Sequence, residues 1–368
     1  MAEMLVAQRH ELLLRELEAA GGLKVSELVN RLGVSGATIR RDLADLEADG
    51  RVTRVRGGAM LAVPPAVSGA AGATATRPSA TPVAPSRALG LLVPSATYYY
   101  PRVVAGVQAA AAARGARIVI GLSDYARPDD LTQIDELRAA GAAGLLVTSA
   151  GGPLVPQATL DRLRDSGLPF VLLERQPQDR YGAYEFVASD HRQGAAAAVR
   201  HLAELGHERV ALFTNGSPTA GHIREGHAAA VEQLGLDASA PVVDSGQPSP
   251  GAAEAAECYD RFVATCLEGG ARAALVHSDH DAIELMRRMR SRGLRTPEDL
   301  ALIAYDDEIA ALADVPLTAV APAKHELGEL AARLLLDRLD AAEPPAVRQV
   351  VLQPRLIVRA SCGAASGG

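Results

Sequence analysis

The feature of this sequence that most constrains its fold is an alternation, from Ala88 onward, of short apolar runs with alanine-rich stretches of helical character. The apolar runs are ALGLLV, RIVIG, AGLLVTS, PFVLLE, RVALFT, AALVHS and LALIAY. Continuous apolar runs of this length are typical of strands that are covered on both faces. Repeated strand, helix and strand units therefore predict an α/β fold, in which a parallel sheet carries helices on both of its faces.

The length of this region indicates how many such sheets it forms. The chain has 368 residues, and a stretch of about 280 residues exceeds what one hydrophobic core usually fills. We therefore expect two doubly wound lobes over residues 87–361, followed by a disordered tail over residues 362–368. Ligands of open α/β sheets bind at the carboxyl ends of the strands, so the candidate binding residues are sought there.

Residues 62–86 differ in composition from the sequence on either side. They contain five prolines, one charged residue and no aromatic residue. A segment of this composition buries too little apolar surface to offset the entropy of ordering, so we predict a linker. A flexible coil of this length spans roughly 25 to 30 Å. Residues 1–61 are therefore predicted to form a separate domain.

The N-terminal domain shows the pattern of three short amphipathic helices, because leucine and isoleucine recur there at three- or four-residue spacing. Ser26 and Ser35 are good N-caps for the second and third helices. Gly33 and Gly50 stand where those two helices should end. After Gly50 the sequence RVTRVRGGA alternates valine with polar residues, as the wing of a winged helix-turn-helix does.

The net charge of −7 looks unsuited to a DNA-binding protein until it is divided along the chain. Residues 1–60 hold nine Lys or Arg and nine Asp or Glu, so the acidity belongs to the remainder. No acidic residue lies between Arg51 and Gly58, a stretch that also holds Arg54 and Arg56. Such a local basic edge favours contact with nucleic-acid phosphates.

The third predicted helix has the residue types that a helix in the DNA major groove requires. Its leading end must be small or polar to approach base edges, and it needs cations where it passes phosphates. Ser35 and Thr38 meet the first need, and Arg40 and Arg41 meet the second. We expect Asp42 to steer a neighbouring arginine or to face solvent. The alternative is a charged helix that packs on another domain.

The segment VSGATIRRDLADLEADGRVTRVRGGA closely resembles the DeoR family of winged helix-turn-helix repressors. The pattern of that family includes Ser-x-x-Thr-Ile-Arg-Arg-Asp-Leu and a Gly-Gly wing end, and the resemblance covers residues 5–60. The resemblance implies base and phosphate contacts from the third helix, and phosphate or minor-groove contacts from the wing. The residues that it places on double-stranded DNA are Ser35, Thr38, Arg40, Arg41, Arg54 and Arg56.

The remainder of the chain departs from the DeoR family and resembles the sensor of the LacI/GalR repressors over residues 88–361. The resemblance is carried by LGLLVPSATYYYPRVVAGVQAAAAARG, AAVRHLAELGHERVALFTNG and MRSRGLRTPEDLALIAYDDE. That sensor has a type I periplasmic-binding-protein fold, in which two lobes close on a sugar or nucleoside. The resemblance implies a homodimeric repressor with two heads on a palindromic or repeated operator. Effector binding between the lobes would change how the heads are held.

A sugar site needs carboxylates and amides that bond to hydroxyl groups, and an aromatic face for the C–H surface of the ring. Asp279 stands where the family has the acid of an Asn-Asp pair, and Asp306 matches the first acid of its Phe-Asp-Asp. Glu174 and Arg175 end the run PFVLLE, where the family commonly has Asp-Arg. The remaining effector candidates are Tyr98, Tyr99 and Tyr100, which replace an Asn-Pro-Phe-type turn, and Arg224, which lies beside the family's effector-binding arginine position.

Each of these effector candidates has a plainer alternative. Asp279 and Asp306 could be the N-caps of the helices that follow them. The tyrosine run could form a dimer contact instead of a stacking platform. Glu174 and Arg175 could form a salt bridge between the lobes.

Two other function classes fit parts of the sequence. A solute-binding receptor would use the same sensor fold, but the DNA-binding head and the absence of a recognisable signal peptide oppose it. A metal-dependent hydrolase is suggested by four residues whose spacing is poor for one metal site. These residues are His277, Asp279, His280 and Asp281. We therefore expect no catalytic residue, no metal and no cofactor.

The chain is expected to act in the cytoplasm. Three cysteines without a CxxC pair fit neither a disulfide framework nor a structural zinc site, which favours a reducing compartment. No run of about 18 apolar residues predicts a membrane span.

Overall fold

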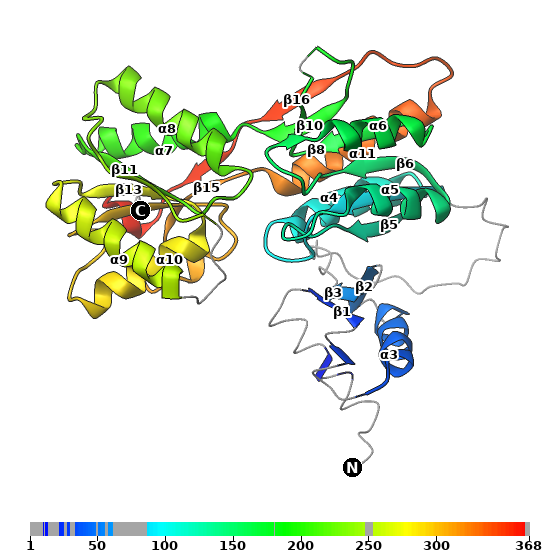
Figure 1. The fold of residues 1–368 in the computed structure, drawn as a ribbon, viewed down its shortest axis with the longest axis horizontal. Helices are drawn as coiled ribbons and strands as arrows, with labels where there is room; N and C mark the ends of the chain where they lie inside the picture. Colours follow the sequence, from blue (N-terminus) through cyan, green and yellow to red (C-terminus); the bar gives the residue numbers. More distant parts are fainter. Residues whose placement is uncertain are drawn as a thin grey trace, which may run out of the picture. The chain divides into compact units, whose positions relative to one another are not determined.

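The computed structural model describes residues 10, 12–13, 22–25, 28–29, 34–48, 51–55, 58–61, 87–179, 181–246 and 253–364. The predicted linker, residues 62–86, lies outside them. The chain divides into two compact units. The first unit comprises residues 1–187 and 324–349, and the second comprises residues 188–323 and 350–368. The chain therefore passes between the units three times (Figure 1).

The N-terminal domain forms an antiparallel sheet in the order β1-β3-β2 and one fully bounded helix, α3 (Gly36–Ala48). Its strands are β1 (Gly22–Lys24), β2 (Val52–Val55) and β3 (Gly58–Leu61). The β2–β3 hairpin confirms the predicted wing. Strand β1 was not predicted, because three residues are too few to show an alternating pattern. The buried core of this domain consists of Leu13, Leu28, Ile39, Leu43, Leu46 and Val52.

A six-stranded sheet in the order β16-β10-β8-β6-β4-β5 begins in the first unit, and its strands β10 and β16 continue past the residues at which that unit ends. Its strands are β4 (Ala88–Val93), β5 (Arg117–Leu122), β6 (Ala142–Val147), β8 (Phe170–Leu173), β10 (Phe186–Ser189) and β16 (Gln349–Leu352). A short separate pair is formed by β7 (Leu154–Val155) and β9 (Gln176–Pro177). The strands from β4 to β10 pair in parallel, which confirms the parallel sheet that the apolar runs predicted.

The helices of this sheet pack in two pairs, α4 with α11 and α5 with α6. Their bounds are α4 (Tyr100–Ala113), α5 (Asp130–Ala139), α6 (Gln157–Asp165) and α11 (Lys324–Asp340). The α4 and α11 backbones touch, because a Cβ on Gly106 would lie 1.9 Å from the His325 carbonyl oxygen. A Cβ on Gly328 would lie 2.1 Å from the Val103 carbonyl oxygen. These two glycines therefore set the spacing between the helices.

The second unit contains a sheet in the order β12-β11-β13-β14-β15-β17. Its strands are β11 (Val210–Thr214), β12 (Val242–Asp244), β13 (Ala273–Val276), β14 (Ala301–Tyr305), β15 (Thr318–Ala321) and β17 (Arg355–Ile357). All pairings are parallel except that of the edge strand β17 with β15. An antiparallel edge strand on an otherwise parallel sheet is common in α/β proteins.

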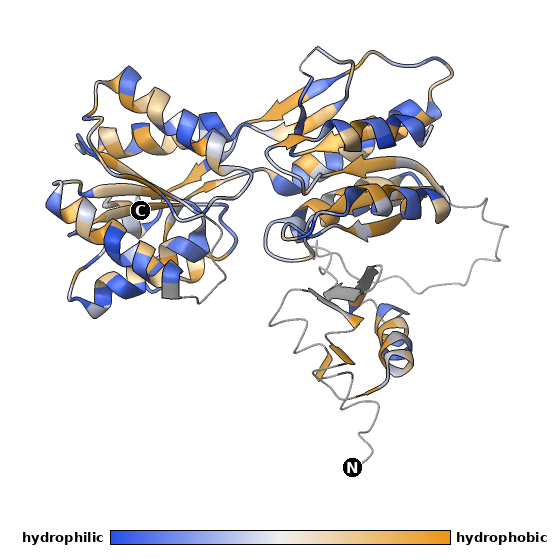
Figure 2. Cartoon of the chain, viewed as in Figure 1, coloured by the Kyte–Doolittle hydropathy of each residue, from blue (hydrophilic) through white to orange (hydrophobic). Residues whose placement is uncertain are grey.

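The helices of the second unit also pack in pairs, α7 with α8 and α9 with α10. Their bounds are α7 (His191–Glu204), α8 (Ala220–Leu234), α9 (Ala253–Glu268) and α10 (Asp279–Ser291), with short 3-10 turns η1 (Ala310–Leu312) and η2 (Ala360–Cys362). The strands of both sheets are mostly hydrophobic and the helices are striped with hydrophilic residues (Figure 2). This pattern is what burial of a sheet under amphipathic helices requires.

The predicted tail starts too early. Cys362 is buried, and its sulfur lies 3.1 Å from the Thr318 hydroxyl oxygen. The neighbouring Ser361 hydroxyl accepts the Thr318 N–H at 2.8 Å and donates to the Leu302 carbonyl at 2.6 Å. The packed sensor therefore extends past residue 361, while residues 365–368 lie outside the described residues.

Candidate DNA-binding and effector sites

The start of α3 has the cap that the sequence predicted. The Ser35 hydroxyl accepts the Thr38 N–H at 3.2 Å, and the two hydroxyl oxygens lie 2.8 Å apart. Ser35 and Arg41 are exposed and Thr38 is half-buried, while Ile39 and Leu43 are buried. The helix therefore turns one face toward the core of the N-terminal domain and leaves Ser35 and Arg41 available to a ligand.

Three of the six predicted DNA contacts are described only in part or not at all. Arg40 lies in α3 and Arg54 lies in β2, but their side chains are outside the described part of the structure. Arg56 lies outside the described residues altogether. Their contacts with DNA remain predictions from the sequence.

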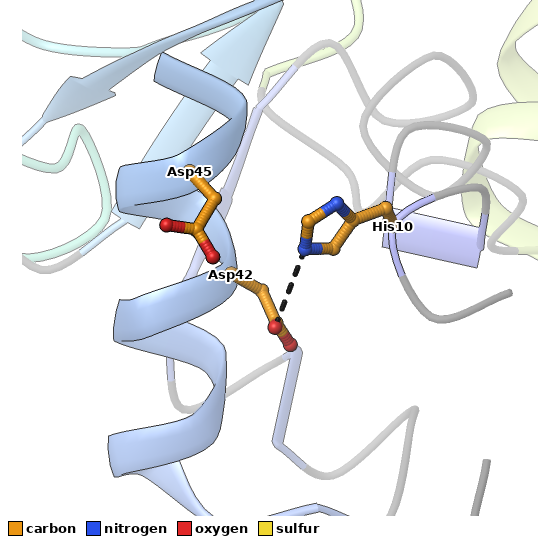
Figure 3. A group of neighbouring side chains, drawn as sticks. All are labelled: His10, Asp42 and Asp45. Carbon is orange, nitrogen blue, oxygen red and sulfur yellow. Dashed lines mark ion pairs between the residues drawn. The ribbon is translucent and has the colours of Figure 1, made fainter. Parts of the chain in front are cut away.

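Asp42 neither faces solvent nor belongs to the exposed side of α3. It is 1% exposed, and one of its carboxylate oxygens lies 3.3 Å from His10 Nε2 (Figure 3). Asp45, one turn further along α3, is exposed and is turned toward the same imidazole. The prediction that Asp42 faces solvent is therefore wrong. A buried carboxylate is retained where it finds a polar partner, and for Asp42 the His10 imidazole is such a partner.

The tyrosine run follows the carboxyl end of β4, and the rings of Tyr99 and Tyr100 contact groups that follow other strands. The Tyr99 hydroxyl donates a hydrogen bond to Glu174 Oε1, and Lys324 Nζ lies 4.9 Å from the centre of the Tyr99 ring. The Tyr100 and Tyr125 hydroxyl oxygens lie 2.8 Å apart. Burial raises the pKa of Tyr100 well above its ordinary value, so its hydroxyl stays protonated at neutral pH.

Glu174 and Arg175 follow β8 and are both buried. Glu174 adopts a left-handed backbone conformation, with φ of 58°, as does Tyr98, with φ of 59°. Arg175 Nη2 donates to the Tyr125 hydroxyl at 3.3 Å, and Nη1 donates to the Glu174 carbonyl at 3.4 Å. We name the group that these contacts bring together in the first unit the tyrosine cluster. It consists of Tyr99, Tyr100, Tyr125, Glu174, Arg175 and Lys324.

Sequence reasoning missed two members of the tyrosine cluster, Lys324 and Tyr125. Tyr125 comes shortly after β5, so a stricter search of strand ends would have found it. Lys324 is the first residue of α11 and reaches Tyr99 from the other end of the chain. Lys324 is the third residue after the end of β15, which a search of strand ends could find, but the sequence does not show that its partner is Tyr99.

The Asp279 carboxylate follows β13 and accepts hydrogen bonds from backbone N–H groups that follow β14, so it links the two strand ends. Its Oδ2 accepts the N–H groups of Glu308, Ile309 and Ala310 at 2.7, 2.8 and 3.2 Å. The N-cap of α10 is Ser278 and not Asp279, so the capping alternative for Asp279 is wrong. Its carboxylate therefore shapes the loop after β14.

Asp306 ends β14 beside a buried histidine. Its Oδ2 lies 3.8 Å from His277 Nε2, and its φ is 87°. The N-cap of the 3-10 turn that follows is Ile309, so the capping alternative is wrong for Asp306 as well. Burial lowers the pKa of His277, with Asp306 opposing that shift. The ring of His277 also packs edge-on against Tyr305, at 5.5 Å between ring centres.

The remaining candidates of the second unit have partners of their own. Arg224 Nη2 donates to Asp244 Oδ2 at 2.6 Å, and Arg224 is exposed on α8. Asp281, from the stretch that resembles metal ligands, accepts hydrogen bonds from Asn215 Nδ2 at 2.9 Å and from the Tyr259 hydroxyl at 2.7 Å. Asp279 and Asp281 therefore bond to different neighbours.

Within the described ranges, one group of three potential metal ligands brings its ligand atoms within 4.8 Å of one another, and it is His10, Asp42 and Asp45. It does not include the stretch from His277 to Asp281. No helix among the residues that the structure describes is long and apolar enough to span a membrane.

Comparison with known proteins matches each part of the chain to a family model. Residues 9–63 match the DeoR-like helix-turn-helix domain. Residues 86–260 match the periplasmic binding proteins and sugar binding domain of the LacI family, and residues 199–362 match the periplasmic binding protein-like domain. An uncharacterized HTH-type transcriptional regulator of Streptomyces limosus is 30% identical over 74% of this chain and 78% of its own length. The chain belongs to the LacI-type transcriptional regulators.

Two further proteins show how far the likeness of this regulator extends. The arabinose metabolism transcriptional repressor of Geobacillus stearothermophilus is 23% identical over 91% of the regulator and 89% of its own length. The crystal structure of the transcription regulator GntR from Chromobacterium violaceum is 28% identical, with a TM-score of 0.64, over 75% of the regulator and 99% of that chain. These relatives are transcription regulators and not enzymes.

Proposed function

We propose that this regulator is a repressor, and that a small sugar-like or nucleoside effector in its sensor changes how tightly its N-terminal domain binds operator DNA. The observation that carries the proposal is the union, in one chain, of a DeoR-like helix-turn-helix domain with a LacI-type sugar-binding sensor. A relative that covers nearly the whole chain is named as a repressor of arabinose metabolism, which supports both the sign of regulation and the class of effector.

The proposed DNA surface is the exposed side of α3 together with the wing. Ser35 and Thr38 lie at the leading end of the helix, where base edges are approached, and Arg41 is exposed one turn later. Arg40, Arg54 and Arg56 complete the surface by their positions in the sequence. Phosphate contacts from these arginines would release counterions and make DNA binding strongly dependent on salt.

The proposed effector contacts lie at the carboxyl ends of the strands. In the first unit they are the tyrosine cluster and Tyr98. In the second unit they are Asp306 and Arg224, whose guanidinium also donates to Asp244. Asp279 is proposed to act by holding the loop at residues 308–310 in place, because its Oδ2 already accepts three backbone N–H groups.

The contact of α4 with α11 supports a route from effector to DNA-binding domain. Tyr99 and Lys324 meet at the first ends of the two helices. At their far ends Arg114 bonds to Asp337 at 2.7 Å, and Arg87, the first described residue after the predicted linker, forms an ion pair with Asp340. The two helices therefore run parallel, and a shift at the tyrosine cluster would move the point where the linker joins the sensor.

We also infer a homodimer in the cytoplasm without enzymatic activity. Two-fold symmetric regulators bind operators whose half-sites repeat, and a regulator meets DNA in the cytoplasm. The relatives of the chain are transcription regulators, which supports a binding protein over an enzyme.

The test is the binding of the purified full-length chain to its own promoter region, measured by fluorescence anisotropy at several salt concentrations. We expect Arg41→Ala to weaken binding and to flatten the salt dependence. The matched control is Arg287→Ala, which removes an arginine that is 69% exposed in the second unit. Specific binding that is weakened by Arg41→Ala and unchanged by Arg287→Ala supports the proposal. Binding no tighter than to random duplex overturns it.

A further inference from the structure

We infer that the effector carries a negatively charged group, a carboxylate or a phosphate, that binds the Arg175 guanidinium in the tyrosine cluster. The inference rests on the proposed function, because it presupposes a small-molecule effector at this edge of the first sheet. It adds the charge of the effector, which neither the family models nor the names of the relatives state.

The hydrogen bonds of Arg175 are incomplete. A guanidinium has five N–H donors, and Arg175 is 5% exposed. Its bonds to the Tyr125 hydroxyl and the Glu174 carbonyl are long, at 3.3 and 3.4 Å, and its buried Nε has no hydrogen-bond partner. Both acceptors are neutral. The Glu174 carboxylate also attracts Arg175 electrostatically, but without a hydrogen bond to it. A buried guanidinium whose hydrogen-bond acceptors are all neutral is costly, unless an anion completes it in the working state.

Another buried charge in the same unit shows what a completed arrangement looks like. The Glu185 carboxylate accepts from Arg338 Nε at 2.8 Å and from Arg348 Nε at 3.4 Å, so its charge is neutralised on both oxygens. Arg175 forms no ion pair of this kind among the residues that the structure describes. This difference points to an external partner for Arg175.

Among the described residues, no hydrogen bond of Arg175 reaches a carboxylate. The Glu174 carboxylate already accepts the Tyr99 hydroxyl, and Lys324 packs on the face of the Tyr99 ring. The hydrogen bonds of Arg175 go to the Tyr125 hydroxyl and the Glu174 carbonyl. An anionic group of a ligand would complete the guanidinium, whereas a neutral sugar would offer it only further neutral oxygens.

The surrounding geometry suits a ring-shaped ligand. The cluster gathers residues that follow β4, β5 and β8, at the strand ends where ligands of parallel sheets bind. Tyr98 and Glu174 hold left-handed backbone conformations there, a strain that proteins concentrate at functional sites. Arginine suits this role because its planar fork binds a carboxylate or phosphate through two parallel hydrogen bonds.

The first experiment compares matched pairs of compounds by calorimetry on the full-length chain. The pairs are galactose with galacturonate, glucose with glucuronate, and glucose with glucose 6-phosphate. We expect at least one anionic member to bind and its neutral partner to bind far more weakly. The two uronate arms distinguish a carboxylate from the phosphate arm. Arg175→Gln is expected to weaken the anion about 30-fold or more.

The second experiment needs no effector. If Arg175 is kept for a ligand, Arg175→Met should leave the thermal unfolding midpoint of the ligand-free protein unchanged or raise it, because a buried and incompletely bonded charge is removed. The matched control, Arg338→Met, should lower the midpoint, because it removes a partner of the buried Glu185. Equal destabilisation by the two variants would show that Arg175 is structural and would overturn the inference.

The outcomes separate the inference from the proposed function. If the chain binds its promoter and a neutral sugar releases it as well as the charged partner does, the effector is neutral and only the inference fails. If no anion of the panel binds, the inference also fails while promoter binding still supports a repressor. If the chain does not bind its promoter at all, the proposed function fails.

Discussion

The glycine contact between α4 and α11 allows a stability prediction whose magnitude follows from the structure. In Gly328→Ala, the new Cβ would lie 2.1 Å from the Val103 carbonyl oxygen, an atom of the backbone that no side-chain rotation can move. The helices would have to separate by roughly 1 Å, a gap that forfeits a quarter to a half of each contact's attraction. Overpacking of this kind costs about 3 kcal/mol, and the better helix propensity of alanine returns about 1 kcal/mol. The expected net loss is about 2 kcal/mol, or about 4 to 8 °C in the unfolding midpoint.

Thermal unfolding of the full-length chain measures this loss, and Gly221→Ala is the matched control. Gly221 also lies in a helix, α8, but a Cβ there meets no atom within 4 Å. Gly221→Ala should therefore leave stability unchanged or raise it by up to about 1 kcal/mol. If Gly328→Ala unfolds at the same temperature as Gly221→Ala, the helices have room to separate freely, and the reasoning that these glycines set the spacing is refuted.

Three further predictions concern buried polar groups. Asp279→Ala should destabilise the second unit by about 2 to 3 kcal/mol, because it leaves the backbone N–H groups at 308–310 without their acceptor, and urea unfolding measures the change. Burial lowers the pKa of His277 in the folded state, so near neutral pH the folded chain binds fewer protons than the unfolded chain. The stability of the fold should therefore fall as pH drops below about 6.5, the ordinary pKa of histidine. A His277→Gln variant that keeps the full slope of stability against pH would contradict this. Asp42→Ala should cost the N-terminal domain about 1 to 3 kcal/mol through loss of the His10 contact, and a weaker promoter complex with unchanged effector binding is the expected readout.

The elements of this regulator could be predicted because their signals are local. A buried parallel strand is a run of apolar residues, and each of the seven runs forms a strand of a parallel sheet. The Ser35 cap of α3 was predictable for the same reason, since a cap and its N–H donor lie three residues apart. Strand β1 escaped prediction because its three residues carry no period.

The roles of single residues were harder to predict, because each role depends on which groups the folded chain brings into contact with that residue. Asp279 and Asp306 look alike in sequence, each following a buried strand, and both were considered as helix caps. In the structure Asp279 accepts hydrogen bonds from three backbone N–H groups, whereas Asp306 lies beside His277. Both arrangements arise because the loops after two neighbouring strands meet at one sheet edge. Asp42 had the appearance of a surface acid on a polar helix face, but in the folded domain it is buried and lies beside His10.

The sequence by itself determined what kind of protein this is. Amphipathic periods, caps, a change of composition at residues 62–86 and two sets of motifs are all contained in short windows, so they predict a DNA-binding domain joined to a two-lobed sensor. Only the tertiary structure decided which charges meet. Lys324 reaches Tyr99, Arg114 reaches Asp337, and Arg175 is left with neutral acceptors because helices and strands far apart in the chain pack together. Electrostatic balance is a property of that packing and has no local pattern in the sequence.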